Sequence, residues 1–252
     1  MNQRGKGLRK KEGRSFKAQR KHILSENSSF GVREAYKTLR ANVRFSAPGE
    51  ECKKICVTSG LSGEGKSITT LNIAISFAES GKRVLLIDAD LRRPAMARLL
   101  VENGAPGLSN VLAGLCREED AIREERYPNL DVLFSGEIPP NPSELLGSVP
   151  MEQLIGRLSK RYDYIFVDTP PVNVVSDACV LASILDGVLF VVRQNHSERD
   201  SVKRGVGQLK MAGAKLLGFV LNGAETGSSK RYGKYYYYES YGYDPRNREQ
   251  EE

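Results

Sequence analysis

The residues of this sequence with the clearest chemistry are 60–67, which read G-L-S-G-E-G-K-S. This is the G-x-x-x-x-G-K-S pattern of a phosphate-binding loop, in which glycines let backbone N–H groups point at phosphate oxygens. A lysine adds positive charge at the β- and γ-phosphates, and the positive end of the following helix strengthens the anion site. We therefore expect nucleotide to be bound by Gly60, Ser62, Gly63, Glu64, Gly65, Lys66, Ser67 and Ile68.

Acidic residues follow two further apolar segments of the chain. Asp88 and Asp90 lie in D-A-D-L-R-R-P, and Asp168 ends Y-I-F-V-D. Carboxylates at the carboxyl ends of strands lie where ligands of open α/β sheets bind. We expect Mg²⁺ to be held by Ser67, Asp90 and Asp168, directly or through water, with Asp88 as the first choice for a proton acceptor. Exchanged roles for Asp88 and Asp90 remain an alternative.

Strands and helices alternate along residues 54–222. Apolar runs at 83–88, 164–167, 187–193 and 215–222 are typical of buried parallel strands, and helical patterns separate them. The alternation predicts an α/β fold of the P-loop NTPase type, a single domain with a doubly wound, mostly parallel sheet and helices on both faces. Residues 103–147, rich in Gly and Pro, form a long passage of the kind that is usually functional or regulatory.

The two ends of the chain differ from this middle part. Residues 1–25 hold nine lysines and arginines against one glutamate, in a chain of net charge +7. We expect 1–29 to be a basic disordered tail, either simply solvated, or attracted to an anionic membrane by ~1 kcal/mol per basic residue, or in contact with nucleic acid. Residues 30–223 are the expected folded domain. Residues 224–252 are an expected flexible tail, because 232–243 hold seven of the eleven tyrosines without Leu, Ile or Val.

Composition excludes several classes of protein. The four cysteines form no C-x-x-C pair and there are only two histidines, so neither a zinc site nor a disulfide framework is expected. No apolar run reaches the ~18 residues that span a bilayer, and the first residues lack the apolar core of a signal peptide. These features predict a cytoplasmic protein. The positive charge is concentrated in 1–25, so it does not by itself argue for a nucleic-acid partner.

A helix is expected over residues 30–45, because apolar side chains recur there at helical spacing. Glu34, Lys37 and Arg40 lie three apart on another face of this helix. They form either a solvated charged stripe or a surface for contact between subunits.

Taken together, these motifs resemble the bacterial tyrosine kinases, the autophosphorylating enzymes that govern capsule and exopolysaccharide assembly. The resemblance covers residues 30–243 and rests on 62–67, 85–94, 165–171, P-P-N-P-S-E-L-L at 139–146 and the tyrosine-rich end. It implies an ATP- and Mg²⁺-dependent, non-specific protein-tyrosine kinase that uses Lys66, Asp88 and Asp90 in catalysis, with Asn222 contacting adenine. The implied phosphoacceptors, on a neighbouring subunit, are Tyr232, Tyr235, Tyr236, Tyr237, Tyr238, Tyr241 and Tyr243.

The resemblance also implies partners. The family assembles into a homo-oligomeric ring, here an expected octamer, through an E-x-x-R-x-x-R helix motif that appears as Glu34, Lys37 and Arg40. Lysine in place of the first arginine loses the bidentate fork of a guanidinium. The stand-alone cytoplasmic type needs a membrane-protein activator, a polysaccharide co-polymerase, which would hold the chain at the inner face of the membrane. Other protein-tyrosine substrates are compatible with this type.

Two other classes compete with the kinase. The MinD/ParA-like positioning ATPases share the fold and the Asp-x-Asp motif, but carry a signature lysine where this chain has Leu61. A tyrosine-rich tail also has no role in them. A nucleic-acid-binding ATPase driven by the basic N-terminus would show salt-sensitive DNA affinity that disappears when residues 1–25 are removed.

Overall fold

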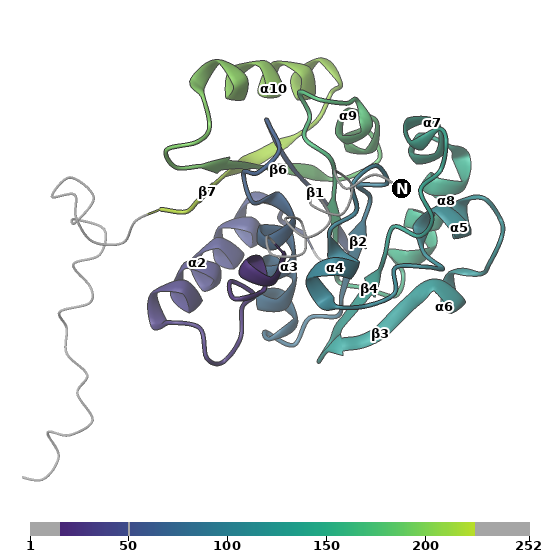
Figure 1. Ribbon diagram of the computed structural model, residues 1–252, viewed down its shortest axis with the longest axis horizontal. Helices are drawn as coiled ribbons and strands as arrows, with labels where there is room; N and C mark the ends of the chain where they lie inside the picture. Colours follow the sequence, from purple (N-terminus) through teal and green to yellow (C-terminus); the bar gives the residue numbers. More distant parts are fainter. Residues whose placement is uncertain (1–15, 50, 225–252) are drawn as a thin grey trace, which may run out of the picture. The chain divides into compact units, whose positions relative to one another are not determined.

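The computed structural model describes residues 16–49 and 51–224. In them, seven strands form one sheet (Figure 1), in the order β3 (Ile122–Tyr127), β4 (Leu130–Leu133), β2 (Val84–Asp88), β5 (Tyr164–Asp168), β1 (Lys53–Ser59), β6 (Gly187–Arg193) and β7 (Leu216–Asn222). All neighbouring pairs are parallel except β3 with β4. The mostly parallel, doubly wound sheet predicted from the sequence is confirmed.

Helices cover both faces of this sheet. One face carries α2 (Phe30–Ser46), α3 (Lys66–Ala78) and α4 (Met96–Leu100); the other carries α5 (Leu108–Leu112), α6 (Glu118–Ala121), α7 (Pro142–Leu146), α8 (Val149–Leu158), α9 (Asp177–Ala182) and α10 (Arg199–Met211). Figure 1 shows α2 and α3 on one side of β6 and β7, with α10 on the other. Among the helices of the described residues, none has the length and apolar character needed to cross a bilayer.

Each face of the sheet has its own apolar core. On the α3 side, the Phe77 ring lies 4.2 Å from the Tyr164 ring and 5.2 Å from the Phe166 ring, measured between centroids. On the α10 side, Phe190 and Leu209 are buried in the second cluster. Alternate residues of the apolar strands therefore enter opposite cores, which explains why these strands read as continuous apolar runs.

The strand register brings the chemically active residues together. β5 lies between β2 and β1, with Asp168 directly opposite Asp88 on one side and Val57 on the other. β1 ends at Ser59, immediately before the glycine-rich loop. Because the three strands are parallel, their carboxyl ends place the loop and both acidic segments at one edge of the sheet.

The edge strand β3 was not predicted from the sequence. Its residues I-R-E-E-R-Y are mostly charged, and only Ile122 is buried. An edge strand with one solvated side needs few apolar residues, so its sequence lacks the pattern of a central strand. An irregularity between Arg123 and Tyr127 includes Glu125 at φ 49°.

The expected disordered tail is wrong for residues 16–29. Residues 16–20 are helical, and Leu24 is buried. The Asn72 side chain on α3 accepts a hydrogen bond from Leu24 N at 2.8 Å and donates one to His22 O at 2.8 Å. The segment has no periodic pattern of its own, but it is docked by the Asn72 amide, by Leu24 and by the partly buried Phe16 and Ile23. Residues 1–15 and 225–252, including the predicted phosphoacceptor tyrosines, lie outside the described part of the chain.

Candidate active site

The glycine-rich loop has the backbone geometry that its sequence predicts. Gly63 and Gly65 have φ values of 87° and 89°, which L-residues with a Cβ adopt only with strain. α3 begins at Lys66 with Gly65 as its N-cap, and no side chain caps it. The N–H groups of the first helical turn are therefore available to an anion at the loop.

Lys66 lies at the point where the acidic residues meet. Its Nζ is 3.0 Å from Asp90 Oδ2 and 3.5 Å from Asp168 Oδ2, and 3.2 Å from Ser67 Oγ. Asp168 is fully buried and Asp90 is 4% exposed. Burial opposes the charge of Lys66, but Asp168 and Asp90 outweigh it and raise the lysine's pKa. Burial likewise raises the pKa of Asp168, while Lys66 and a hydrogen bond from Ser67 oppose the rise.

This arrangement fits a divalent cation coordinated by hard oxygen ligands. Asp90, Asp168 and Ser67 present oxygens around one position, which the Lys66 ammonium group now shares. Within residues 16–49 and 51–224, no group of three or more His, Cys, Asp or Glu side chains is arranged to hold a metal ion by protein ligands alone. Mg²⁺ is commonly held by one or two carboxylates with phosphates and water completing the shell, so two carboxylates and a hydroxyl suit it.

Asp88 occupies a different position from Asp90. It is fully buried; its Oδ1 accepts a hydrogen bond from Asp90 N at 3.2 Å, and its Oδ2 accepts from Ala95 N at 3.1 Å and Met96 N at 3.0 Å. Burial, reinforced by the charge of Asp168, raises the pKa of Asp88 to about 7. A carboxyl group with a pKa near neutrality can accept a proton at physiological pH. The same carboxylate also fixes the shape of the 88–96 loop.

The structure adds contacts that sequence analysis missed. Thr70 Oγ1 contacts Asp168 Oδ1 at 3.3 Å from the first turns of α3. Arg92 donates to the buried Asp177 through Nε at 3.0 Å and Nη2 at 3.2 Å, and its Nη2 also donates to Ser143 Oγ at 2.8 Å. Ser143 belongs to the P-P-N-P-S-E-L-L motif, so a role for that motif was foreseeable. Nothing in the sequence distinguished Asp177.

The remaining predicted nucleotide residues are placed as follows. Asn222 lies against the glycine-rich loop, with its Nδ2 donating to Glu64 O at 2.9 Å. A Cβ at Gly65 would come within 2.0 Å of that nitrogen, so the close approach requires glycine. Ser62 is exposed at the loop surface, and Ile68 packs partly buried against the α3 core.

The predicted subunit-contact residues on α2 have partners within their own chain. Lys37 Nζ and Glu34 Oε1 form an exposed ion pair at 2.6 Å. The Arg40 guanidinium donates to the Ser76 carbonyl and to Ser76 Oγ on α3. The structure thus groups Glu34 with Lys37 but turns Arg40 toward α3.

Known proteins are similar to this chain in both sequence and fold. Residues 52–209 match the AAA domain family. The chain is 37% identical over 225 residues to the tyrosine-protein kinase YwqD of Bacillus subtilis, covering 89% of this chain and 95% of that protein. The crystal structure of the chimerical protein CapA2B2 superposes with a TM-score of 0.74 at 36% identity, covering 78% of this chain and 86% of that one.

A structure from the competing class is also similar, but less so. The cell division ATPase MinD of Pyrococcus furiosus superposes with a TM-score of 0.58 at 30% identity, covering 71% of this chain and 74% of that one.

Proposed function

The chain belongs to the bacterial tyrosine kinases and is a protein-tyrosine autokinase, and we propose that it transfers phosphate from ATP to tyrosines 232–243 of a neighbouring copy. The observation that supports this most directly is the position of Lys66. Its ammonium group lies 3.0 Å from Asp90 and 3.5 Å from Asp168, at the start of α3 and beside the glycine-rich loop. Phosphoryl transfer depends mainly on positioning and on neutralising charge, and this site supplies both.

Each residue has a proposed role in that transfer. The N–H groups of residues 63–67 bind the phosphates, and Lys66 neutralises charge on the bridging oxygen. Ser67, Asp90 and Asp168 would hold Mg²⁺, which supplies charge neutralisation at the β- and γ-phosphates when bound. Asp88, with its pKa raised by burial to about 7, accepts the proton of the attacking tyrosine. Asn222, on the other side of the loop, contacts the adenine.

The tyrosine-rich end has the reach to serve a neighbouring active site. The ten to twenty residues that follow Gly223 span ~30–65 Å when extended, at ~3.3 Å per residue. Several adjacent tyrosines make the acceptor degenerate, so no single tyrosine is essential. Each phosphate adds about −1.5 to −2 charges, and repulsion among modified tails provides a physical route to disassembly of an oligomer.

Family membership supports further proposals about partners. We infer a homo-oligomeric ring in which α2 contacts the next subunit, with Glu34 and Lys37 on the contact surface and Arg40 bracing α2 on α3. We also infer a membrane-protein activator that brings the kinase to the inner face of the membrane, and a role in regulating capsule or exopolysaccharide export.

Phosphosite mapping tests the proposed function. The full chain is incubated with Mg-ATP and the cytoplasmic segment of its activator, and phosphate is located by mass spectrometry. We expect phosphotyrosine within 232–243, lost in Lys66→Met and retained in Lys160→Met, a matched change at an exposed lysine. Labelling that survives Lys66→Met would refute the site assignment. ATP hydrolysis without phosphotyrosine would favour the positioning-ATPase class.

A further inference from the structure

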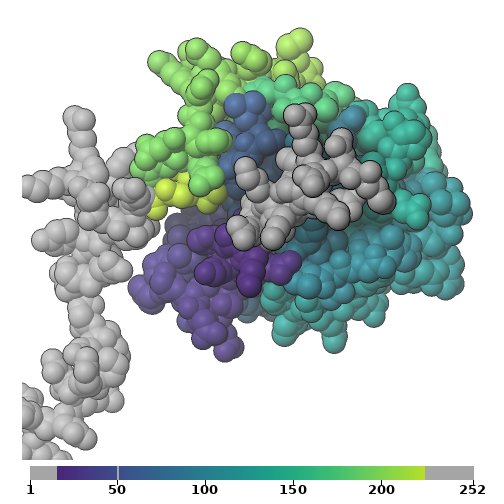
Figure 2. All heavy atoms as spheres, in the orientation of Figure 1, coloured from purple at the N-terminus to yellow at the C-terminus, as the bar shows by residue number. Residues whose placement is uncertain are grey.

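The last residue of β6 and the loop that joins it to α10, together residues 193–198, contact the glycine-rich loop. Arg193 Nη1 donates to Gly63 O at 2.9 Å, and Ser197 Oγ donates to the Glu64 carboxylate. Figure 2 shows the green surface of the β6–α10 region bordering the blue surface of the chain near residue 60. Two segments more than 120 residues apart in sequence are thus in direct polar contact.

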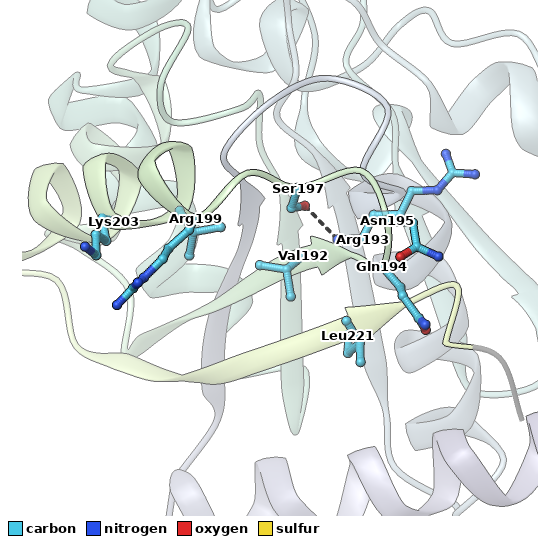
Figure 3. Close-up of a pocket in the computed structure, with 9 residues that line it drawn as sticks. Val192, Arg193, Gln194, Asn195, Ser197, Arg199, Lys203 and Leu221 are labelled. Carbon is cyan, nitrogen blue, oxygen red and sulfur yellow. Dashed lines mark hydrogen bonds between the residues drawn. The ribbon is translucent and has the colours of Figure 1, made fainter. Parts of the chain in front are cut away.

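The contact through Ser197 is a relay of hydrogen bonds. Arg193 N donates to Ser197 Oγ at 2.8 Å, as drawn in Figure 3, and the same hydroxyl donates onward to Glu64 Oε1. The other carboxylate oxygen, Oε2, accepts a hydrogen bond from Leu61 N at 2.8 Å. Glu64 is 1% exposed, so its carboxylate oxygens are hydrogen-bonded by these protein donors rather than by water.

The relay restricts the backbone conformation of residues 61–64, which the glycine in this part of the loop does not restrict. Gly63 has little steric preference of its own, yet the loop must aim several N–H groups at one set of phosphates. The Glu64 side chain ties Leu61, three residues earlier, to the rigid backbone of β6. A loop that occupied other shapes would bind nucleotide with an affinity reduced by the fraction of molecules in the competent shape.

Packing does little to hold the β6–α10 loop in place. Arg193 and Ser197 border an open hollow of about 390 Å³, which Val192, Val202 and Leu221 also line. Figure 3 shows Val192 and Leu221 beside Arg193 and Ser197. Since no closely packed side chains fill this space, the hydrogen bonds are left to define where the loop lies.

We propose that Ser197 is a positioning residue for nucleotide binding: its hydroxyl relays the Arg193 backbone N–H to the Glu64 carboxylate and so holds the glycine-rich loop in its phosphate-binding shape. This inference rests on the proposed role of residues 60–68 as the nucleotide site. Ser197 acts through Glu64 and has no assigned contact with the reacting atoms.

Nucleotide affinity in the full chain tests the proposal. The dissociation constants of Mg-ADP and Mg-ATP are measured by calorimetry for the unmodified protein, Ser197→Ala and Ser197→Thr. We expect Ser197→Ala to bind nucleotide about tenfold more weakly, which corresponds to a glycine-rich loop that holds its phosphate-binding shape in about one molecule in ten. The autokinase KM for ATP should rise with it, while kcat at saturating ATP changes little. Ser197→Thr keeps the hydroxyl and should restore affinity, which general destabilisation would not predict.

Control variants separate this inference from the proposed function. Ser183→Ala removes an exposed hydroxyl that donates to Val180 O at 2.7 Å, away from the loop, and should leave affinity unchanged. Unchanged affinity in Lys66→Met would refute the nucleotide site itself. Lost affinity in Lys66→Met with unchanged affinity in Ser197→Ala would overturn only the relay.

A second variant keeps the proposal testable if Ser197→Ala does not fold. Glu64→Gln removes the charge to which the hydroxyl donates while keeping the side-chain shape, and should weaken nucleotide binding to a similar extent. Unchanged affinity in Glu64→Gln would overturn the relay. Where both variants fold, the double variant should bind no more weakly than the weaker single variant, because both changes break one relay. Additive losses would contradict it.

Discussion

Two arginine–aspartate pairs of the same geometry differ mainly in how deeply the aspartate is buried. Arg92 binds Asp177 through Nε and Nη2 at 3.0 and 3.2 Å, and Arg117 binds Asp120 through the same two atoms at 3.2 Å each. The Asp177 side chain is 0% exposed and the Asp120 side chain 51% exposed. The exposed Arg117–Asp120 pair therefore serves as a control for the energetic effect of burying the charge of Asp177.

We expect Arg92→Ala to lower the free energy of unfolding by about 2 kcal/mol. Removing one partner of a buried ion pair typically costs about 3–5 kcal/mol, because it leaves an unpaired buried charge. Here the cost is reduced, since the Arg92 side chain is 37% exposed and water can reach the vacated space. Ser143 Oγ, 2.5 Å from Asp177 Oδ1, also continues to donate to the carboxylate. A loss of about 2 kcal/mol corresponds to a decrease in Tm of about 4–8 °C.

Urea and thermal unfolding of Arg92→Ala and Arg117→Ala measure the difference. Arg117→Ala should leave stability essentially unchanged, because both of its partners are solvated. Asp177→Asn, added to Arg92→Ala, should recover part of the loss by removing the unpaired charge. Equal effects of the two arginine substitutions, or no recovery in the double variant, would refute the reasoning from burial.

Three further predictions concern other parts of the fold. Val101, the C-cap of α4, has the left-handed angles φ 60° and ψ 46°, which are strained for valine, and it is 68% exposed. Val101→Gly should therefore raise the free energy of unfolding, measured by urea titration, by about 0.5–1 kcal/mol. A decrease would contradict the inferred strain. Asn72→Ala removes the amide that hydrogen-bonds to residues 22 and 24. Trypsin should therefore cut this variant faster at Lys17 and Arg20 than it cuts the unmodified protein. Unchanged cleavage rates would count against the docking. Burial raises the pKa of the Cys52 thiol from 9.0 to about 11, which lowers the fraction of reactive thiolate at pH 8 about 100-fold. Alkylation of Cys52 at pH 8 should be slower by about that factor in the native protein than in urea. Comparable rates would show that the thiol is not shielded.

Local patterns in the sequence were sufficient for most of the fold and for the central part of the site. Glycine spacing in residues 60–67 predicted a phosphate-binding loop with backbone conformations that a Cβ would hinder, and Gly63 and Gly65 have positive φ angles. Continuous apolar runs predicted the central strands, because a strand covered by helices on both faces has no solvated side. Because β2 and β5 are parallel, Asp90 and Asp168 meet at the same end of the sheet, beside Lys66.

Contacts between distant segments were decided only by the tertiary structure. Asp177 looks in sequence like any helix N-terminal aspartate, and only folding brings Arg92 and Ser143 to it from 85 and 34 residues away. Residues 16–29 carry no periodic pattern, and their docking combines the buried Asn72 amide with a few apolar side chains such as Leu24. Ser197 likewise has no sequence feature that marks it. Its contact with Glu64 exists because β6 ends beside β1, and strand order is a property of the whole sheet rather than of any local stretch.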